Sequence, residues 1–137
     1  MTDVKYISID KINHITYNIG NKNYKVGNML EVLFGSKNRE RVLQYVLANG
    51  EGYAKEMADF YGTSLDPIQK QLEKLELGGV FVSKTVGRTR LFMFNPRYAF
   101  SSELKALLEK AREYYDPKEI ERLTMKRKRP RRAGKPL

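Results

Sequence analysis

The sequence predicts an α+β fold that is mainly helical, and three observations lead to this class. Apolar residues recur with the period of a helix within residues 36 to 77 and again within residues 101 to 115. Residues 80 to 86 and 91 to 94 are instead rich in β-branched and aromatic residues and are joined by Gly87-Arg88-Thr89, the pattern of a β-hairpin. The chain has 137 residues, 41% of them hydrophobic, which is enough for one modest core with extensions.

Residues 1 to 27 form an N-terminal extension with the chemistry of β-strands. Apolar residues alternate with others at Ile7 and Ile9 and again over residues 15 to 19. Residues 20 to 23, with the sequence GNKN, are typical of a turn. We therefore expect a short β-meander in this extension.

Three helices are expected between residues 36 and 79, in the order long, short, long. Ser36 is a suitable N-cap for the first helix, which ends near Gly50. The second ends at Gly62, because glycine adopts a left-handed C-cap conformation at little cost. The third begins within residues 63 to 67, where a proline is tolerated in the first turn. The positions expected to face the core are Val42, Leu43, Val46 and Leu47 in the first helix, Ala54, Met57, Ala58 and Tyr61 in the second, and Leu65, Ile68, Leu72 and Leu75 in the third.

Two further helices are expected within residues 97 to 125. Ser101 can cap the first of them, and Asp116-Pro117 resembles the start of the second. The first carries an apolar stripe that we interpret as the contact of a homodimer, with coverage of the monomer's own core as the alternative. This stripe consists of Leu104, Leu107, Leu108, Ala111 and Tyr115.

The net charge of +10 is concentrated at the C-terminal end of the chain. Residues 126 to 137 carry seven Lys and Arg residues and no Asp or Glu. This run has no apolar periodicity and would repel itself without a counter-charge, so we expect a tail that is disordered alone and contacts a polyanion. A tail that only aids solubility is the alternative. A second basic stretch lies between residues 77 and 102, where Lys84, Arg88, Arg90 and Arg97 occur without any acidic residue.

The order of the central elements, within residues 28 to 96, predicts a winged helix-turn-helix. In this arrangement two helices present a third to the major groove of duplex DNA, while a hairpin with a basic tip reaches phosphates or the minor groove. We therefore predict sequence-specific binding of duplex DNA. The expected contacts are Ser64, Gln69, Lys70, Gln71 and Lys74 on the third helix, Arg88 and Arg90 on the hairpin, and Lys126, Arg127, Lys128, Arg129, Arg131 and Arg132 in the tail.

At these residues the chain resembles the ArsR-like winged-helix transcriptional regulators, over about residues 30 to 115. The resemblance is carried by the segments LFGSKNRERVL, IQKQLEKL, GVFV, VGRTRLF and NPRY. It implies a transcriptional regulator whose recognition helix presents Gln69, Lys70 and Gln71 ahead of the apolar anchor Leu72. The sequence departs from the metal-sensing branches of that family, which use cysteine-containing signatures. An accessory winged-helix module that binds RNA or a protein partner, for instance in plasmid maintenance, is the alternative function.

Other classes of function find little support in the sequence. No GxxxxGK[ST], GxSxG or HExxH arrangement occurs, so we expect no enzymatic activity. Cysteine is absent and His14 is the single histidine, so we expect neither a metal site nor a cofactor. No apolar run approaches the length of a membrane span, and the first residues lack the order of a secretory signal. We therefore expect a cytoplasmic protein without a membrane partner.

Overall fold

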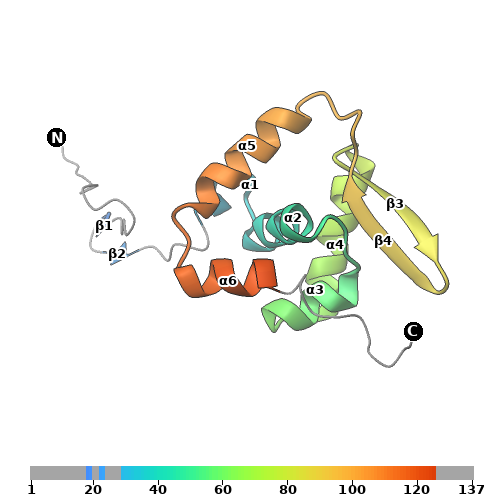
Figure 1. The fold of residues 1–137 in the computed structure, drawn as a ribbon, viewed down its shortest axis with the longest axis horizontal. Coiled ribbons are helices and arrows are strands. Elements are labelled where there is room, and N and C mark those ends of the chain that lie inside the picture. The colour runs from blue at the N-terminus through green and yellow to red at the C-terminus, as the bar shows by residue number, and fades with distance from the viewer. Residues whose placement is uncertain (1–17, 20–21, 24–28, 126–137) are drawn as a thin grey trace.

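Helices dominate the computed structural model, which describes residues 18–19, 22–23 and 29–125. The helices are α1 (Glu31–Phe34), α2 (Lys37–Asn49), α3 (Ala54–Tyr61), α4 (Leu65–Leu77), α5 (Ser101–Arg112) and α6 (Pro117–Met125). The strands β1 (Asn18–Ile19) and β2 (Lys22–Asn23) pair antiparallel, as do β3 (Phe81–Val86) and β4 (Thr89–Phe94). The expected α+β class with a predominance of helices is thus confirmed (Figure 1).

Helix α2 lies at the centre of the core, with the other long helices arranged around it (Figure 1). Its residues Val42, Tyr45 and Val46 have no exposed surface. The residues buried with them come from every element between α3 and α6 and include Met57, Ala58, Ile68, Leu72, Phe81, Phe92, Leu108 and Leu123. Helices α5 and α6 therefore belong to the same core as the central helices. Burial of apolar surface is the main force that stabilises a fold, so both helices contribute to the stability of this core.

The helix ends follow the local chemistry that the sequence indicates. The Ser36 hydroxyl accepts a hydrogen bond from the Arg39 amide at 3.1 Å, which caps α2. Gly62 has φ 63° and ψ 39°, the left-handed conformation, and the Thr63 amide donates to the Ala58 carbonyl at 3.0 Å. Both predicted caps are therefore confirmed. They leave only residues 62 to 64 between α3 and α4, so these two helices meet through a tight turn.

Two predicted positions in the helices are wrong by a small margin. Leu65, expected in the core, is the first residue of α4 and is 41% exposed, because the buried face begins only at Ile68. Ser101, expected as a cap, is the first helical residue of α5, and Phe100 occupies the N-cap without a side-chain hydrogen bond. Helix periodicity identifies faces more reliably than it identifies terminal residues.

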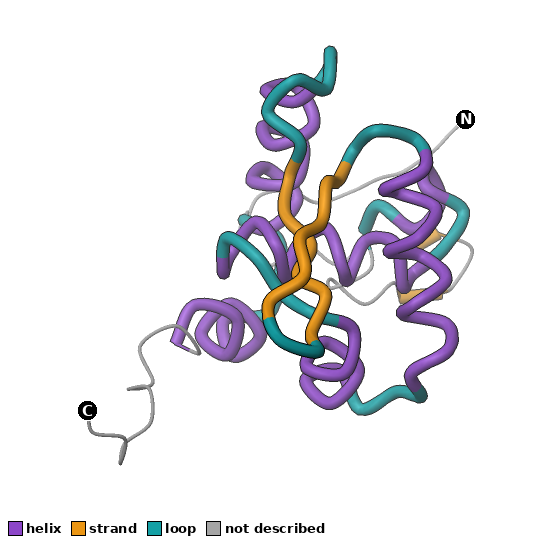
Figure 2. Tube along the Cα trace, turned by 90° about the vertical axis from the view of Figure 1, so that its right-hand side faces the viewer, coloured by secondary structure: helices purple, strands orange, loops and turns teal. Residues whose placement is uncertain are grey.

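The β3–β4 hairpin is longer than the sequence suggests. The strands pair from Phe81 with Phe94 to Val86 with Thr89, so the turn consists of Gly87 and Arg88 alone. Gly87 has φ 65°, as a tight two-residue hairpin turn requires. Thr89 belongs to β4 rather than to the connection. Figure 2 shows the two strands twisted around each other, as paired strands prefer.

The hairpin is joined to the helical core through Gly52, in the connection between α2 and α3. Gly52 and Phe92 exchange two backbone hydrogen bonds, of 3.1 and 2.8 Å. A Cβ atom on Gly52 would lie 2.8 Å from Tyr45 Cε1 and 2.9 Å from Met57 Cε. Only glycine therefore lets the backbone approach the core this closely.

We expect Gly52→Ala to lower the free energy of unfolding by about 1–3 kcal/mol, the usual cost of overpacking a core. The Tyr45 ring has no exposed surface, so making room for the added Cβ requires a shift within the packed core, which would loosen the bridge to Phe92. Urea unfolding measures the change. Gly78→Ala is the matched control, because a Cβ there meets its nearest atom at 3.4 Å and the φ of Gly78 is −83°. Equal stability of the two variants would contradict the close approach.

Helix α5 covers the core of its own protomer with much of the apolar stripe. Leu108, Ala111 and Tyr115 are buried, Leu104 packs against the cluster, and Leu107 remains 37% exposed. The buried part of the stripe thus covers the core of the same chain, which is the alternative interpretation. Leu108, Ala111 and Tyr115 are therefore not exposed for contact with a second copy in this fold. Dimerisation itself stays a prediction.

The N-terminal extension is described at four residues only. Asn18 pairs with Asn23 and Ile19 with Lys22, so Lys22 and Asn23 form a strand instead of belonging to the turn. The rest of the predicted β-meander, together with His14, lies outside the described residues. Within the described part of the chain, no helix is long and apolar enough to cross a membrane.

A buried carboxylate joins three parts of the helical domain. Glu40 of α2 has no exposed surface. Its Oε1 accepts from the Leu30 amide at 2.8 Å, and its Oε2 accepts from the Tyr115 hydroxyl at 2.5 Å. Burial raises the pKa of this carboxyl above its ordinary value, although both hydrogen bonds act in the opposite direction. Glu40 therefore holds the entry to α1 and the end of α5 against α2.

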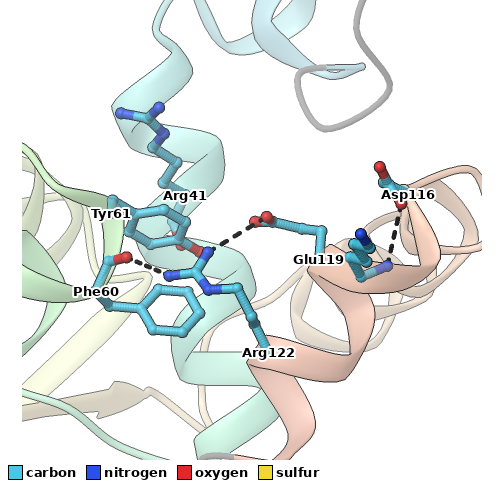
Figure 3. Close-up of polar contacts among 7 residues, drawn as sticks. Arg41, Phe60, Tyr61, Asp116, Glu119 and Arg122 are labelled. Atoms are coloured by element: carbon cyan, nitrogen blue, oxygen red, sulfur yellow. Dashed lines mark hydrogen bonds and ion pairs between the residues drawn. The ribbon is translucent and has the colours of Figure 1, made fainter.

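Helix α6 is attached to α3 by an arginine (Figure 3). The guanidinium of Arg122 lies 3.9 Å from the centre of the Phe60 ring and donates to the Phe60 carbonyl and to Glu119. Next to it, Arg41 lies 5.2 Å from the centre of the Tyr61 ring, and the Tyr61 hydroxyl donates to the Arg41 carbonyl at 3.0 Å. Because the Phe60 carbonyl belongs to the last turn of α3, Arg122 supplies a donor that this helix end lacks.

Candidate nucleic-acid interface

Helix α4 buries one face and exposes the other. Ile68, Leu72 and Leu75 are buried against the core. Gln69, Lys70 and Lys74 are exposed on the remaining surface, as the sequence indicates. Ser64, at the N-cap of α4, is exposed and makes no capping hydrogen bond through its side chain. These four polar side chains are therefore accessible to a partner.

Gln71 differs from the other polar positions of α4. It is half-buried, and its Oε1 accepts a hydrogen bond from Arg39 Nε at 2.8 Å. Arg39 also donates to the Phe34 carbonyl at 3.3 Å. Residues two apart on a helix do not face the same way, so Gln69 and Gln71 point to different sides of α4. Gln71 thus connects α4 to the start of α2, and the two glutamines do not form one recognition surface.

The exposed face of α4 carries both signs of charge. Lys70 pairs with Asp66 at 3.7 Å, and both side chains are largely exposed, so the pair is weak. Lys74 has no ion-pair partner among the residues that the structure describes. With Asp66, Glu73 and Glu76 against Lys70 and Lys74, the helix itself is not a strongly basic surface.

The two arginines of the hairpin differ in whether they form an ion pair. Arg88 is exposed in the two-residue turn and makes no ion pair within the described ranges. Arg90 instead pairs with Glu76 of α4, and its Nε donates to the Ser83 hydroxyl at 3.1 Å. Its guanidinium also lies 5.1 Å from the centre of the Phe92 ring. Arg90 therefore connects the hairpin to α4, while Arg88 is available to a ligand.

Sequence reasoning missed Glu76 and Arg39, which hold this surface in place. The Ser83 hydroxyl donates to Glu76 Oε2 at 2.7 Å, so one carboxylate joins the end of α4 to both strands. Glu76 and Arg90 are 14 residues apart, and Arg39 and Gln71 are 32 apart. Pairs at such separations leave no periodic signal in a sequence.

The remaining predicted contacts are not described by the structure. Lys126, Arg127, Lys128, Arg129, Arg131 and Arg132 lie outside the described residues, directly after α6. In the part of the chain that is described, no group of three or more His, Cys, Asp or Glu side chains could hold a metal ion.

Comparisons with known proteins leave the family assignment open. No protein family, curated protein or solved structure shows a significant match to this chain.

Proposed function

We propose that this chain binds duplex DNA as a winged helix-turn-helix protein and regulates transcription. The observation that carries the proposal is the order of α2, α3, α4 and the β3–β4 hairpin, with a tight turn before α4 and exposed polar side chains on it. In this proposal α4 enters the major groove, and the hairpin is the wing that contacts the DNA backbone or the minor groove. The resemblance to ArsR-like regulators favours the same assignment.

Gln69 and Lys74 are the best candidates for base contacts. Both are exposed, neither is held by another side chain among the described residues, and glutamine can bind adenine through two hydrogen bonds. Lysine can bind guanine or a phosphate. Arg88 reaches a phosphate from the turn of the hairpin. Lys70, paired weakly with Asp66, can exchange that partner for a phosphate at little cost.

We expect Gln69→Ala to reduce sequence preference without weakening nonspecific binding. A good bidentate base contact is worth about 1–3 kcal/mol of discrimination, so the affinity ratio between a selected duplex and a scrambled one should fall about 5- to 150-fold. Titration of both duplexes at one salt concentration measures the ratio. Ser102→Ala on α5 is the matched exposed control. A wild-type ratio in the Gln69 variant would place base reading elsewhere.

Arg90 is paired with Glu76, so the carboxylate of Glu76 competes with a phosphate for Arg90 and should weaken binding. We expect Glu76→Gln to raise the affinity for all duplexes several-fold, because it releases Arg90 and removes a negative charge beside the polyanion. The slope of log K against log salt should steepen by about 0.9 if Arg90 gains one phosphate contact. Glu109→Gln on the exposed surface of α5 controls for net charge. An equal gain in both variants would show that Arg90 takes no part.

A protein partner is a second candidate, favoured by exposed apolar residues beside the same surface. Leu77, the last residue of α4, is 89% exposed, and Val86, at the end of β3, is 52% exposed. A polyanion does not require either side chain, whereas the centre of a protein interface is depleted in charge and often apolar. Leu77→Ser separates the two functions, because it should abolish a protein contact and leave DNA affinity within about twofold.

A further inference from the structure

Helix α6 ends beside the turn that leads into α4. In its last turn, Arg122 donates to the Phe60 carbonyl and lies against the Phe60 ring (Figure 3), and the neighbouring Leu123 has no exposed surface. Phe60 precedes Ser64, the N-cap of α4, by four residues. Because a chain spans at most about 3.3–3.6 Å per residue, Phe60 and Ser64 lie within roughly 14 Å of each other. The end of α6 is therefore held near the N-terminal end of α4.

The basic tail, residues 126 to 137, starts at this place. It follows directly after Met125, the last residue of α6. Seven residues lead from Lys126 to Arg132, and they can span up to roughly 25 Å. This reach exceeds the roughly 14 Å between the contact of Arg122 and the N-cap of α4. The basic side chains of the tail can therefore reach phosphates at the N-terminal end of α4.

The charge changes sign along α6. Residues 116 to 121 carry three acidic residues and one lysine, whereas residues 122 to 137 carry eight basic residues and no acidic one. A polyanion is therefore repelled by the start of α6 and attracted to its end, where the tail begins.

The hairpin is joined to the other end of both α3 and α4. It follows α4 along the chain, and Arg90 pairs with Glu76 in the last turn of α4. Phe92 bridges to Gly52, two residues before the start of α3, whereas α6 contacts Phe60 near the end of α3. Helix α4 has 13 residues and is therefore about 20 Å long. The start of the tail and the hairpin are thus separated along α4.

We propose that α6 directs the basic tail to the duplex at the N-terminal end of α4, so that tail and hairpin contact the DNA backbone on opposite sides of the base pairs that α4 reads. This inference rests on the proposed DNA binding. Arg122 is a positioning residue, because it fixes the point from which the tail starts. A fixed starting point raises the effective concentration of the basic side chains at these phosphates without any new contact.

Tethered cleavage of the duplex locates both segments. The chain contains no cysteine, so one introduced cysteine can carry an iron–EDTA group that cuts the DNA near it. Thr85→Cys places the group on the hairpin, and Ala133→Cys places it in the tail. On a duplex with one recognition site, we expect these two groups to cut on opposite sides of the base pairs whose preference is lost in Gln69→Ala. Ser102→Cys, on the exposed surface of α5, is the control and should cut on neither side.

Arg122→Gln tests the positioning role. It should lower the affinity for the selected duplex about threefold or more, and the tail group should then cut on both sides, because the start of the tail is no longer fixed. In a chain whose tail carries Ser or Gln in place of Lys and Arg, the same substitution should change the affinity by less than about 1.5-fold. Lys118→Gln removes an exposed charge from the start of α6 and should leave affinity and cutting positions unchanged.

The outcomes separate the placement of the tail from the proposed function. If the hairpin group cuts while the tail group cuts on both sides equally, on the side of the hairpin or not at all, the placement is overturned and DNA binding stands. Cutting by neither group would overturn both. An equal loss of affinity from Arg122→Gln with and without the basic residues of the tail would show that Arg122 does not act through the tail.

Discussion

Glu40→Ala should lower the free energy of unfolding by about 2–4 kcal/mol, the largest effect on stability that we expect from a single polar side chain. The substitution leaves the Leu30 amide and the Tyr115 hydroxyl without their acceptor in the core. Each unsatisfied buried donor costs about 1–3 kcal/mol, and removal of a buried carboxylate offsets part of this loss. Urea unfolding at pH 7 measures the difference.

Glu40→Gln is the matched control. The difference in stability between this variant and the wild type should depend on pH, with a sign that follows from the pKa of Glu40. The amide has nearly the same shape, can accept from Leu30 and can donate to the Tyr115 oxygen. Folding raises the pKa of Glu40 above its ordinary value of 4.5. The folded chain therefore keeps the carboxyl proton of Glu40 to a higher pH than the unfolded chain does. The contribution of Glu40 to the free energy of unfolding of the wild type therefore falls as the pH rises from 4.5 through the raised pKa.

The Gln variant lacks that titration, so its stability relative to the wild type should increase between pH 4 and pH 7. Glu40→Ala should be the least stable of the three proteins at every pH. An Ala variant as stable as the Gln variant would show that the hydrogen bonds of Glu40 do not hold α1 and α5 against α2.

Neutralising residues 126 to 137 should cause the largest loss of DNA affinity. Seven basic residues lie in this segment, and each phosphate contact contributes about 0.9 to the slope of log K against log salt, so the slope should fall by up to about six. Replacement of the seven Lys and Arg residues by Ser or Gln keeps the length of the chain constant. Fluorescence titration of one duplex at several salt concentrations gives the slope.

The same variant should keep its sequence preference, because phosphate contacts position a protein without reading bases. The ratio between a selected duplex and a scrambled one should therefore stay near the wild-type value, in contrast to the result expected for Gln69→Ala. An unchanged salt slope would show that the tail does not contact the nucleic acid.

Features that depend on neighbouring residues could be predicted from the sequence. The N-cap at Ser36, the C-cap at Gly62 and the buried face of α4 from Ile68 to Leu75 each follow from residues within a few positions. The hairpin was recognisable from its composition. The length of its turn was not, because strand pairing extends to Thr89 once Gly87 adopts a positive φ.

Features that depend on distant partners could not be predicted. A glutamate at position 40 normally indicates an exposed helix surface, yet Tyr115, 75 residues away, makes its burial possible. Arg90 lies in a basic hairpin, where the sequence predicts a DNA contact, but an ion pair with Glu76 holds it against α4. In α5 the helical period identifies an apolar side without revealing that Leu108 is buried while Leu107 is partly exposed.

Selection of duplex DNA from a random library by the full chain tests the proposed function most directly. We expect one sequence to be enriched and to bind at least roughly a thousandfold more tightly than scrambled duplex, as specific regulators do at physiological salt. The selected duplex should also bind more tightly than a structured RNA or a single strand at the same salt concentration. Equal affinity for all of these nucleic acids, without an enriched sequence, would reduce the interaction to the charge of the tail and contradict base reading by α4.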